Sequence, residues 1–314
     1  MVAFAFVFPG QGSQAVGMMG AYGDSPVIRQ TFAEASAALG EDLWRLVAEG
    51  PAETLAQTVN TQPVMLTAGV SVYRLWLAKG GKPPAVVAGH SLGEYSALVA
   101  AGVIRFADAV PLVRLRAAAM QEAVPMGDGA MAAILGLDDE TIASACAEVT
   151  SAAGAGEVVE AVNFNGPGQT VIAGTTAAVE SACAACKARG AKRALLLPVS
   201  APFHSSLMRP AAEKLAARLA EMTFADAQMA VIHNVDAVIA SGGKGIKDAL
   251  VRQAASPVRW VETIRRMAAM GIGTVVECGP GKVLAGLSKR CAESVGSLAL
   301  ADLAAIESAV GQLE

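Results

Sequence analysis

The stretch "AVVAGHSLGEYSALVAAG", residues 85–102, restricts the possible folds more than any other part of the chain. In it Gly89, Ser91 and Gly93 stand two residues apart, after a short apolar run and before a segment with helical composition. Glycines at these places avoid a clash where a strand turns sharply into a helix, and the turn leaves the residue between them strained and exposed. The spacing predicts a Ser91 nucleophile. Because five residues alone do not establish a site, other segments must supply a base, oxyanion donors and a substrate-binding group.

Strand and helix patterns alternate through the first part of the chain, with strands expected over 2–8 and 85–88 and helices over 27–39 and 62–79. This alternation predicts a parallel sheet with helices on both faces. From Gly127 the order becomes strand, helix, two strands, helix and strand, which is a split βαβ arrangement.

These patterns predict an α/β fold with two subdomains. We expect a large subdomain over residues 1–126 and 198–314 and a small one, over residues 127–197, inserted into it. After residue 198 the α/β alternation resumes, and its clearest strand patterns are "MAVIHNVDA" and "GTVVECGPG".

The composition narrows the functional classes. A net charge of −4 argues against nucleic acid as a ligand, since phosphate binding needs a strongly basic face. No uninterrupted apolar run approaches the length that crosses a membrane, and the apolar start is followed at once by Pro9, so we interpret it as a strand and not as a signal peptide. Five cysteines, an odd number, are typical of free thiols in a reducing compartment, and we expect a cytoplasmic protein.

A serine hydroxyl needs a base to become a nucleophile, and histidine suits that role near neutral pH. The sequence has three histidines. His90 adjoins Ser91, and neighbouring side chains on a sharp turn diverge, so we expect it in a supporting position. His204 stands between a strand pattern and a helix pattern, where open α/β sheets carry catalytic groups, and is the expected base. His233, inside an apolar strand pattern, is the alternative.

A histidine base usually has a carboxylate partner at its second ring nitrogen. None of the acidic residues considered follows a late strand of the main sheet, because they stand at helix starts or in the inserted segment: Asp108, Asp128, Asp138 and Asp139. A neutral carbonyl is therefore expected to orient the histidine, which would make the pair a dyad.

An acyl oxyanion needs two N–H donors. The amide of Leu92, at the start of the helix after the turn, is one candidate. The second is expected in the opening loop, "FVFPGQGSQ", which presents Gln11 to the site. Residues 10–15 also fit a dinucleotide-binding pattern, but that pattern requires a second strand about twenty residues later, where residues 27–39 have a helix pattern instead. We therefore reject dinucleotide binding.

Arginine binds a carboxylate in two places, because its planar fork matches both oxygens. Arg114 and Arg116 both lie in the helix pattern that follows the turn, and a helix arginine is more often solvated. The composition leaves the choice between them open. Cys183 and Cys186 stand three apart in a helix pattern without a second pair, so packing on one face explains them better than a redox or zinc site.

The chain resembles the malonyl-CoA:acyl-carrier-protein transacylase family, acyltransferases of fatty-acid and polyketide synthesis. The resemblance runs in order along nearly the whole chain, through "FVFPGQGSQ", "TQPVMLTAG", "AGHSLGEYSALVAAGV", "MQEAVP", "GAMAAILGL", "VNFNGPGQTVIAG", "KRALLLPVSAPFHSSLM", "VRQAASPVRW" and "GPGKVL". It implies a hydrolase-like α/β core with an inserted ferredoxin-like subdomain. The stretch after Arg290 carries little of the family's signature.

The resemblance also implies a role for each site residue. The serine that takes the malonyl group corresponds to Ser91 and the base to His204. The arginine that binds the malonyl carboxylate, four residues before "MQEAVP", corresponds to Arg116. His90 and Phe203 are expected beside the bound substrate.

The oxyanion donors implied by the resemblance are the backbone N–H groups of Gln11 and Leu92. The histidine is oriented by a backbone carbonyl, which in "VRQAASP" belongs to Gln253. Because carrier proteins are acidic, Lys192 and Arg193 near the insert are expected docking contacts.

The implied reaction is a ping-pong transfer of malonyl from malonyl-CoA to the phosphopantetheine thiol of holo acyl carrier protein, without a bound cofactor or metal, by a monomer. Two other functions stay open. A serine esterase or thioesterase would use water as the acceptor, and a noncatalytic subunit would keep the fold only to assemble a complex. The missing acidic partner and the arginine favour transfer over hydrolysis, and the presence of serine, histidine and arginine argues against a noncatalytic subunit.

Overall fold

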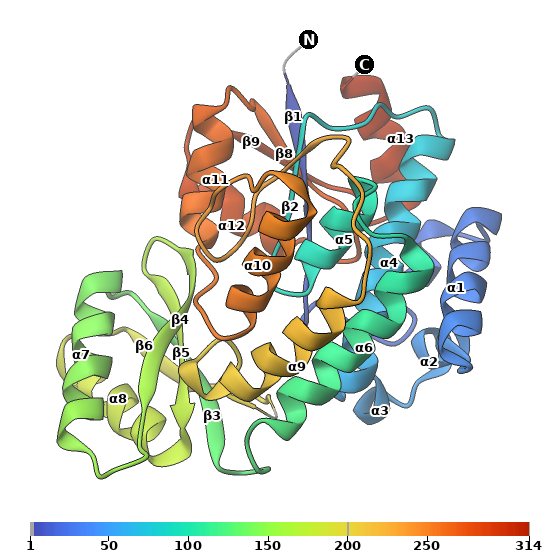
Figure 1. Ribbon diagram of the computed structural model, residues 1–314. Coiled ribbons are helices and arrows are strands. Elements are labelled where there is room, and N and C mark those ends of the chain that lie inside the picture. The colour runs from blue at the N-terminus through green and yellow to red at the C-terminus, as the bar shows by residue number, and fades with distance from the viewer. Residues whose placement is uncertain (1–2, 200, 314) are drawn as a thin grey trace.

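The computed structural model describes residues 3–199 and 201–313, which form two β-sheets with their helices (Figure 1). The fold is α/β: a hydrolase-like core built on a parallel sheet, and a smaller ferredoxin-like unit beside it. This confirms the predicted fold class. No described helix is both long enough and apolar enough to cross a membrane.

The larger sheet has five strands in the order β7-β2-β1-β8-β9, all paired in parallel. Its strands are β1 (Phe4–Phe8), β2 (Val86–Gly89), β7 (Ala230–Val231), β8 (Thr274–Glu277) and β9 (Gly296–Ala299). The central strand β1 is buried along its whole length, as a strand covered on both faces must be. Its side chains alternate between two separate cores, one on each face of the sheet.

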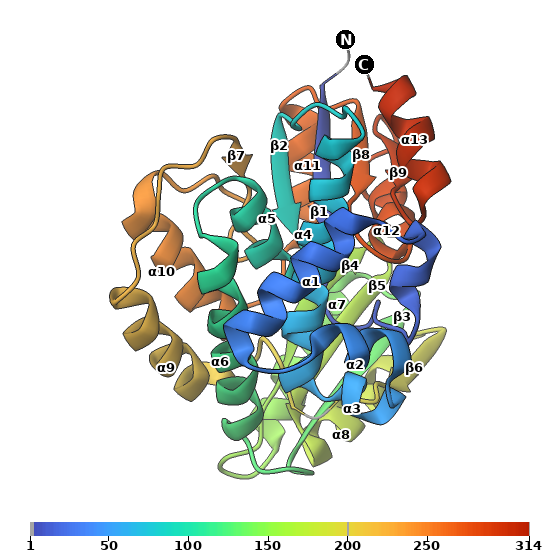
Figure 2. The same ribbon diagram turned by 90° about the vertical axis from the view of Figure 1, so that its right-hand side faces the viewer.

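Helices cover both faces of this sheet. The larger core lies under helices α1 (Pro26–Leu39), α4 (Thr58–Ala78), α5 (Gly93–Ala100), α6 (Phe106–Glu122), α9 (Arg209–Ala220) and α10 (Gly242–Ala254). The second core lies under α11 (Trp260–Ala269) and α12 (Val283–Cys291). Figure 2 views the molecule with α1 and α4 in front of the sheet. The remaining described α-helices of the large unit are α2 (Leu43–Glu49), α3 (Ala52–Ala56) and the C-terminal α13 (Leu303–Gln312).

The smaller sheet forms between α6 and α9 in the chain and lies at one end of the molecule (Figure 1). Its elements are β3 (Gly129–Leu135), α7 (Asp139–Ala152), β4 (Val159–Gly166), β5 (Gln169–Thr175), α8 (Thr176–Ala188) and β6 (Arg193–Leu196). The strands pair antiparallel in the order β4-β5-β3-β6, and both helices pack on one core. We propose that this unit is the small subdomain, with residues 127 and 197 as its limits.

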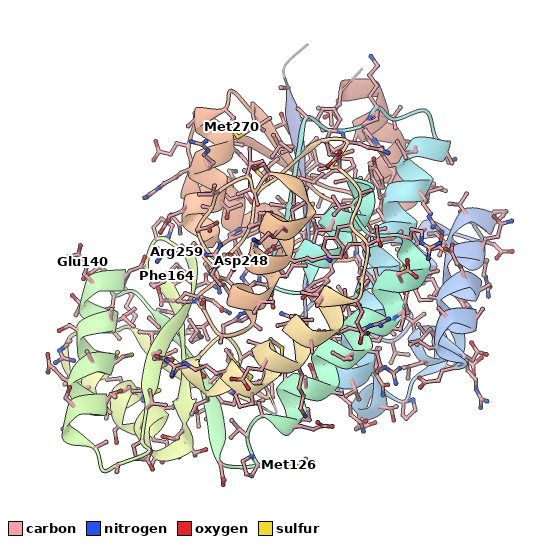
Figure 3. All side chains as sticks on the ribbon, in the orientation of Figure 1. Met126, Glu140, Phe164, Asp248, Arg259 and Met270 are labelled. Atoms are coloured by element: carbon pink, nitrogen blue, oxygen red, sulfur yellow. The ribbon has the colours of Figure 1, made fainter. Side chains whose placement is uncertain are left out.

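Strand β4 also connects the two units. The amide of Val258 donates to the carbonyl of Val162, and the amide of Phe164 donates to the carbonyl of Val258. Figure 3 shows Phe164 beside Arg259 at this junction. The two units are therefore joined by backbone hydrogen bonds as well as by the two chain crossings.

Two parts of the large sheet differ from the expected pattern. The stretch "MAVIHNVDA" contributes only two residues to β7, because His233 and Asn234 leave the sheet and turn inward. In the C-terminal stretch, Val275 of β8 pairs with Ser297 of β9, a strand that the sequence pattern did not indicate.

Candidate active site

Ser91 lies in a sharp turn between β2 and α5, with a left-handed φ of 51°. A Cβ atom at Gly89 would lie 1.9 Å from the carbonyl carbon of Gly93, and one at Gly93 would lie 2.0 Å from the carbonyl oxygen of Phe8. No side chain fits at either glycine without moving backbone. The turn is therefore possible only with glycine on both sides of the serine, as the spacing predicts.

His204 contacts Ser91, although the two residues come from the parts of the chain after and before the small unit. Its Nε2 lies 2.7 Å from Ser91 Oγ, and its Nδ1 lies 2.9 Å from the backbone carbonyl oxygen of Gln253. A carbonyl only accepts hydrogen bonds, so Nδ1 carries the hydrogen and the Nε2 lone pair faces the hydroxyl. This is the arrangement of a base and a neutral orienting group.

The surroundings keep this imidazole uncharged. His204 is 3% exposed, and burial together with the positive charge of Arg116 lowers its pKa to about 3. A neutral imidazole at neutral pH is able to take a proton from the serine hydroxyl.

The other two histidines have different partners. His233 is buried with its Nδ1 2.7 Å from Oε1 of Glu94. His90 Nε2 lies 2.7 Å from Oδ1 of Asn165 on β4, and its ring centre lies 5.5 Å from that of Trp260. Burial lowers the pKa of His90. His90 therefore ties the turn to the small unit, while His204 is the histidine in contact with Ser91.

Arg116 points from α6 to the serine and is 2% exposed. Its Nη1 donates to Oε1 of Gln62 at 2.7 Å, and its Nη2 donates to Ser91 Oγ at 3.2 Å and to Oε1 of Gln253 at 3.0 Å. Its guanidinium carbon lies 5.4 Å from the ring centre of Tyr95. Burial lowers the pKa of Arg116, but a guanidinium stays charged in proteins. A buried cation thus lies beside the Ser91 hydroxyl.

Arg114 lies on the opposite side of the same helix. Two residues correspond to a rotation of about 200°, so side chains two positions apart on α6 point in nearly opposite directions. Arg114 donates to both carboxylate oxygens of Glu41, at 2.9 and 2.6 Å, near the surface. The structure thereby separates two arginines that the composition left equivalent.

The loop after β1 lies against the turn that carries Ser91. A Cβ atom at Gly10 would lie 2.5 Å from the carbonyl oxygen of His90 and 3.7 Å from the amide nitrogen of Leu92. The Gln11 side chain is held by Thr58, whose hydroxyl donates to its Oε1 at 2.6 Å. Leu92 directly precedes α5, where amide N–H groups have no partner within the helix. The loop therefore lies against the turn at Gly10, and Gln11, Ser91 and Leu92 line one cavity.

These groups open into a cavity of about 130 Å³. Its wall combines polar groups around Ser91 with apolar side chains from α6, the small sheet and the segment that precedes α9. The lining residues are Gln11, Gln62, His90, Ser91, Leu92, Arg116, Met120, Met131, Asn163, Leu197, Val199, Phe203 and His204. The predicted substrate-side residues His90 and Phe203 are both among them.

Lys192 and Arg193 lie outside the cavity. Both are exposed, and Arg193 begins β6, one of the two edge strands of the described small sheet. The chain that continues from this strand reaches the cavity wall at Leu197 and Val199. Lys192 and Arg193 therefore lie just before and at the start of β6, which leads to the cavity.

Sequence reasoning missed Asn234 and Glu94. The Oδ1 of Asn234 accepts from the amide of Ser91 at 2.6 Å, and its Nδ2 donates to the carbonyl of Gly89 at 2.6 Å. These two hydrogen bonds fix the backbone of the turn. The signal for Asn234 was an amide inside an apolar strand pattern. The signal for Glu94 was a carboxyl group three residues after Ser91.

Comparisons with known proteins agree with this geometry. The acyl transferase domain family matches residues 5–312. The chain is 58% identical over 311 residues to the malonyl CoA-acyl carrier protein transacylase of Escherichia coli strain K12, covering 99% of each protein.

Solved structures superpose closely on the whole chain. An acyl-carrier-protein S-malonyltransferase from Burkholderia pseudomallei 1710b matches with a TM-score of 0.95 and 57% identity, over 98% of this chain and 99% of that one. A malonyl-transacylase solved in complex with a type II PKS acyl-carrier protein matches with a TM-score of 0.96 and 53% identity, over 99% of both chains. The chain belongs to the acyl transferase family, among the malonyl CoA-acyl carrier protein transacylases.

Proposed function

We propose that the protein transfers the malonyl group of malonyl-CoA to the phosphopantetheine thiol of holo acyl carrier protein, through an ester on Ser91. The observation that carries this proposal is the contact of Ser91 Oγ with both His204 Nε2, at 2.7 Å, and Arg116 Nη2, at 3.2 Å. A nucleophile, a neutral base and a buried cation meet at one oxygen. The cation suits an acyl group that ends in a carboxylate.

In the first half of the reaction, Ser91 Oγ attacks the thioester carbonyl while His204 Nε2 takes its proton. The tetrahedral oxyanion is stabilised by the amides of Gln11 and Leu92. When the intermediate collapses, the C–S bond breaks and His204 returns the proton to the CoA thiolate. Malonyl stays on Ser91 as an ester.

In the second half, the carrier's thiol enters the place that CoA left. His204 takes the thiol proton as the sulfur attacks the ester carbonyl, and the same two amides hold the oxyanion. Collapse breaks the ester C–O bond, and Ser91 regains its proton from His204. Ser91, His204 and the two thiols supply and accept every proton in these steps, and the acyl carbon is neither oxidised nor reduced. We therefore propose a reaction without a resident cofactor or metal.

Arg116 is proposed to hold the malonyl carboxylate through both halves. Its Nη2 lies close enough to Ser91 Oγ for a carboxylate one methylene beyond the ester carbonyl to reach the guanidinium. The apolar side chains of Phe203 and Met120 form part of the wall beside it. An acetyl group lacks the carboxylate and makes no charged contact with Arg116, so we expect the site to discriminate against it.

A test of this function compares two incubations with malonyl-CoA, one with holo carrier protein and one without. Transfer predicts malonyl-carrier in the first, and in the second a stable protein adduct of one malonyl group that maps to Ser91. Ser91→Ala should abolish both. Free malonate formed rapidly in both incubations would indicate a thioesterase instead, and the absence of any adduct or transfer would indicate a noncatalytic protein.

The carrier protein is proposed to dock beside β6, where Lys192 and Arg193 are exposed and complement an acidic partner. Lys192→Glu combined with Arg193→Glu should raise the KM for carrier protein and leave the kinetics with malonyl-CoA unchanged. Lys244→Glu, an exposed lysine just inside the start of α10, is the matched control. An unaltered KM in the double variant would place the docking surface elsewhere.

We also propose that the protein acts in the cytoplasm as a monomer. All five cysteines are free thiols in the structure, which fits a reducing compartment. Size-exclusion chromatography with light scattering tests the oligomeric state, and a mass of two chains would correct it.

A further inference from the structure

Glu94 is a buried carboxyl group under the turn that carries Ser91, and the proposed mechanism gives it no step. It lies in the first turn of α5 and is 0% exposed. Its Oε1 lies 2.7 Å from His233 Nδ1. Its Oε2 accepts from the amide of Asn234 and from Nε2 of Gln253, each at 2.9 Å.

These partners are those of an ionised carboxylate. The N–H groups of Asn234 and Gln253 can only donate, and His233 donates when its Nδ1 carries the hydrogen. A protonated acid would need an acceptor for its own hydrogen. Only Nδ1 of His233 could accept it, in the tautomer that carries the ring hydrogen on Nε2, and that buried N–H would then have no partner among the described residues. Glu94 is therefore a buried negative charge, which is costly unless a positive charge compensates it.

Arg116 carries the opposite charge to Glu94 and is also buried. It is a buried cation whose hydrogen bonds go to the neutral oxygens of Gln62, Ser91 and Gln253. No ion pair within the described chain joins it to a carboxylate at 4.0 Å or less. A buried cation and a buried anion thus lie in one site without touching each other.

The side-chain amide of Gln253 joins the two charges. Its Oε1 accepts from Arg116 Nη2 at 3.0 Å, and its Nε2 donates to Glu94 Oε2 at 2.9 Å. The amide dipole is aligned with its oxygen toward the cation and its N–H toward the anion. The backbone carbonyl of the same residue meanwhile accepts from His204.

We infer that Glu94 is the counter-ion of Arg116, coupled to it through the Gln253 side chain, and that this coupling sets the affinity of the site for the substrate carboxylate. The inference rests on the proposed function, in which Arg116 binds that carboxylate. A direct ion pair would occupy the fork that the substrate needs. A counter-ion one amide away compensates the charge of the empty site and leaves the guanidinium side that faces Ser91 to the substrate.

This arrangement has a consequence for specificity. The negative charge of Glu94 acts on an incoming carboxylate as well as on Arg116, so it offsets part of the attraction for malonyl groups. An acetyl group carries no charge and should be insensitive to Glu94. Glu94 is therefore a positioning residue whose charge lowers malonyl affinity selectively.

The test uses Glu94→Gln in a Ser91→Ala background, where intact thioesters bind without reacting. Glutamine keeps the shape: its oxygen accepts from Asn234 and Gln253, and its amide donates to His233 in the other tautomer. Calorimetric titration should show tighter binding of malonyl-CoA, by roughly tenfold for a charge of this proximity in a partly shielded site. Binding of acetyl-CoA should change by less than about twofold, since the Coulomb term acts only on the charged ligand.

Glu277→Gln in the same background is the matched control. Glu277 is also 0% exposed, but it accepts from the amide of Ala285 at the start of α12 and not from the active-site groups. It should leave the preference between the two thioesters unchanged. Equal weakening of both ligands by Glu94→Gln, or no change in either, would overturn the counter-ion role. Equal affinity of the Ser91→Ala protein for both thioesters would instead contradict the proposed function.

Folding supplies a second, independent readout. Urea unfolding of Glu94→Gln, Arg116→Met and the double variant forms a double-mutant cycle. Each single change leaves one buried charge uncompensated, so the double variant should be more stable than the sum of the single losses predicts. If Glu94→Gln alone does not fold, a folded double variant supports the coupling. Additive losses, or failure of the double variant to fold, would overturn it.

Discussion

Arg116→Ala removes the buried guanidinium beside Ser91, and its consequence follows directly from the geometry of the site. In the proposed complex, two N–H groups of Arg116 bind the malonyl carboxylate. Hydrogen bonds to a charged group contribute roughly 1.5–3 kcal/mol each, so two of them would contribute about 3–6 kcal/mol.

Competition within the empty site places the expected loss at the lower end of this range. Both terminal nitrogens already donate to neutral oxygens, at 2.7 Å to Gln62, 3.0 Å to Gln253 and 3.2 Å to Ser91. The carboxylate replaces some of these bonds and does not add to all of them. A net loss of about 3 kcal/mol corresponds to a fall of roughly 150-fold in kcat/KM for malonyl-CoA.

The assay measures Ser91 acylation by malonyl-CoA and by acetyl-CoA in rapid-quench experiments. The ratio of the two specificity constants is the readout, because a general distortion of the site lowers both rates and cancels in it. Arg114→Ala is the matched control: it breaks a near-surface pair with Glu41 on the same helix, and exposed pairs contribute about 0–1 kcal/mol. Its malonyl-to-acetyl ratio should equal that of the wild type.

An unchanged ratio in a folded Arg116→Ala protein would refute this reasoning, as would an equal loss with both donors. Either result would mean that the substrate carboxylate is held by another group. Thermal unfolding of both arginine variants establishes that the comparison is made between folded proteins.

Four further predictions follow from the same geometry. His204→Ala should slow acylation of Ser91 by roughly 10²–10⁴-fold, the usual contribution of a general base, and an unaffected quench time course would exclude the residue as the base. Because burial lowers the pKa of His204 to about 3, its base form persists and acylation should stay level between about pH 5 and 8, whereas a decline centred near pH 6.5 would show that the imidazole titrates normally. The unfolded chain takes up a proton near pH 6.5 that the folded site does not accept, so His204 should lower stability as the pH falls from about 6.5 to 3, by up to roughly 1.4 kcal/mol per unit, in urea titrations. Gly93→Ala would bring a Cβ atom to 2.0 Å from the carbonyl oxygen of Phe8 and should destabilise the fold by about 3 kcal/mol, whereas Gly286→Ala, in open space on α12, should not; similar unfolding midpoints for the two would contradict the tight turn.

The sequence was sufficient for the features that depend on local backbone. The glycine spacing around Ser91 predicts the turn because no larger residue fits there, and the structure has that turn. The strand and helix patterns from Gly127 predict the order strand, helix, two strands, helix and strand for a similar reason, since period and turn residues are local properties, and the structure has that order. The fold class could therefore be predicted from the residues.

Tertiary contacts determine which arginine is buried and where strand β7 ends, and local sequence patterns do not show either. Arg114 and Arg116 stand on one helix with apolar neighbours on more than one side, and only the packing of α6 against α4 and α9 fixes which arginine is buried. The resemblance to a family selected Arg116, whereas composition did not. Similarly, the pattern "MAVIHNVDA" predicts a longer strand than β7, because no local signal indicates that His233 and Asn234 turn inward to Glu94.

Glu94 shows why a charged residue inside a recognised motif is easily passed over. An acidic residue in the first turn of a helix is usually explained by the helix dipole. The three hydrogen bonds that make it part of the site come from residues 139, 140 and 159 positions away in the sequence. No pattern in a single chain encodes such distances, so the role of Glu94 could only come from the assembled structure.

The most direct measurement of the central claim is a chase of the isolated malonyl-protein adduct. The account predicts that holo carrier protein removes the malonyl group from Ser91 one-for-one and becomes malonylated, whereas apo carrier protein, which lacks the thiol, leaves the ester intact. Release of free malonate in place of malonyl-carrier, or transfer that persists in Ser91→Ala, would contradict transfer through a malonyl ester on Ser91.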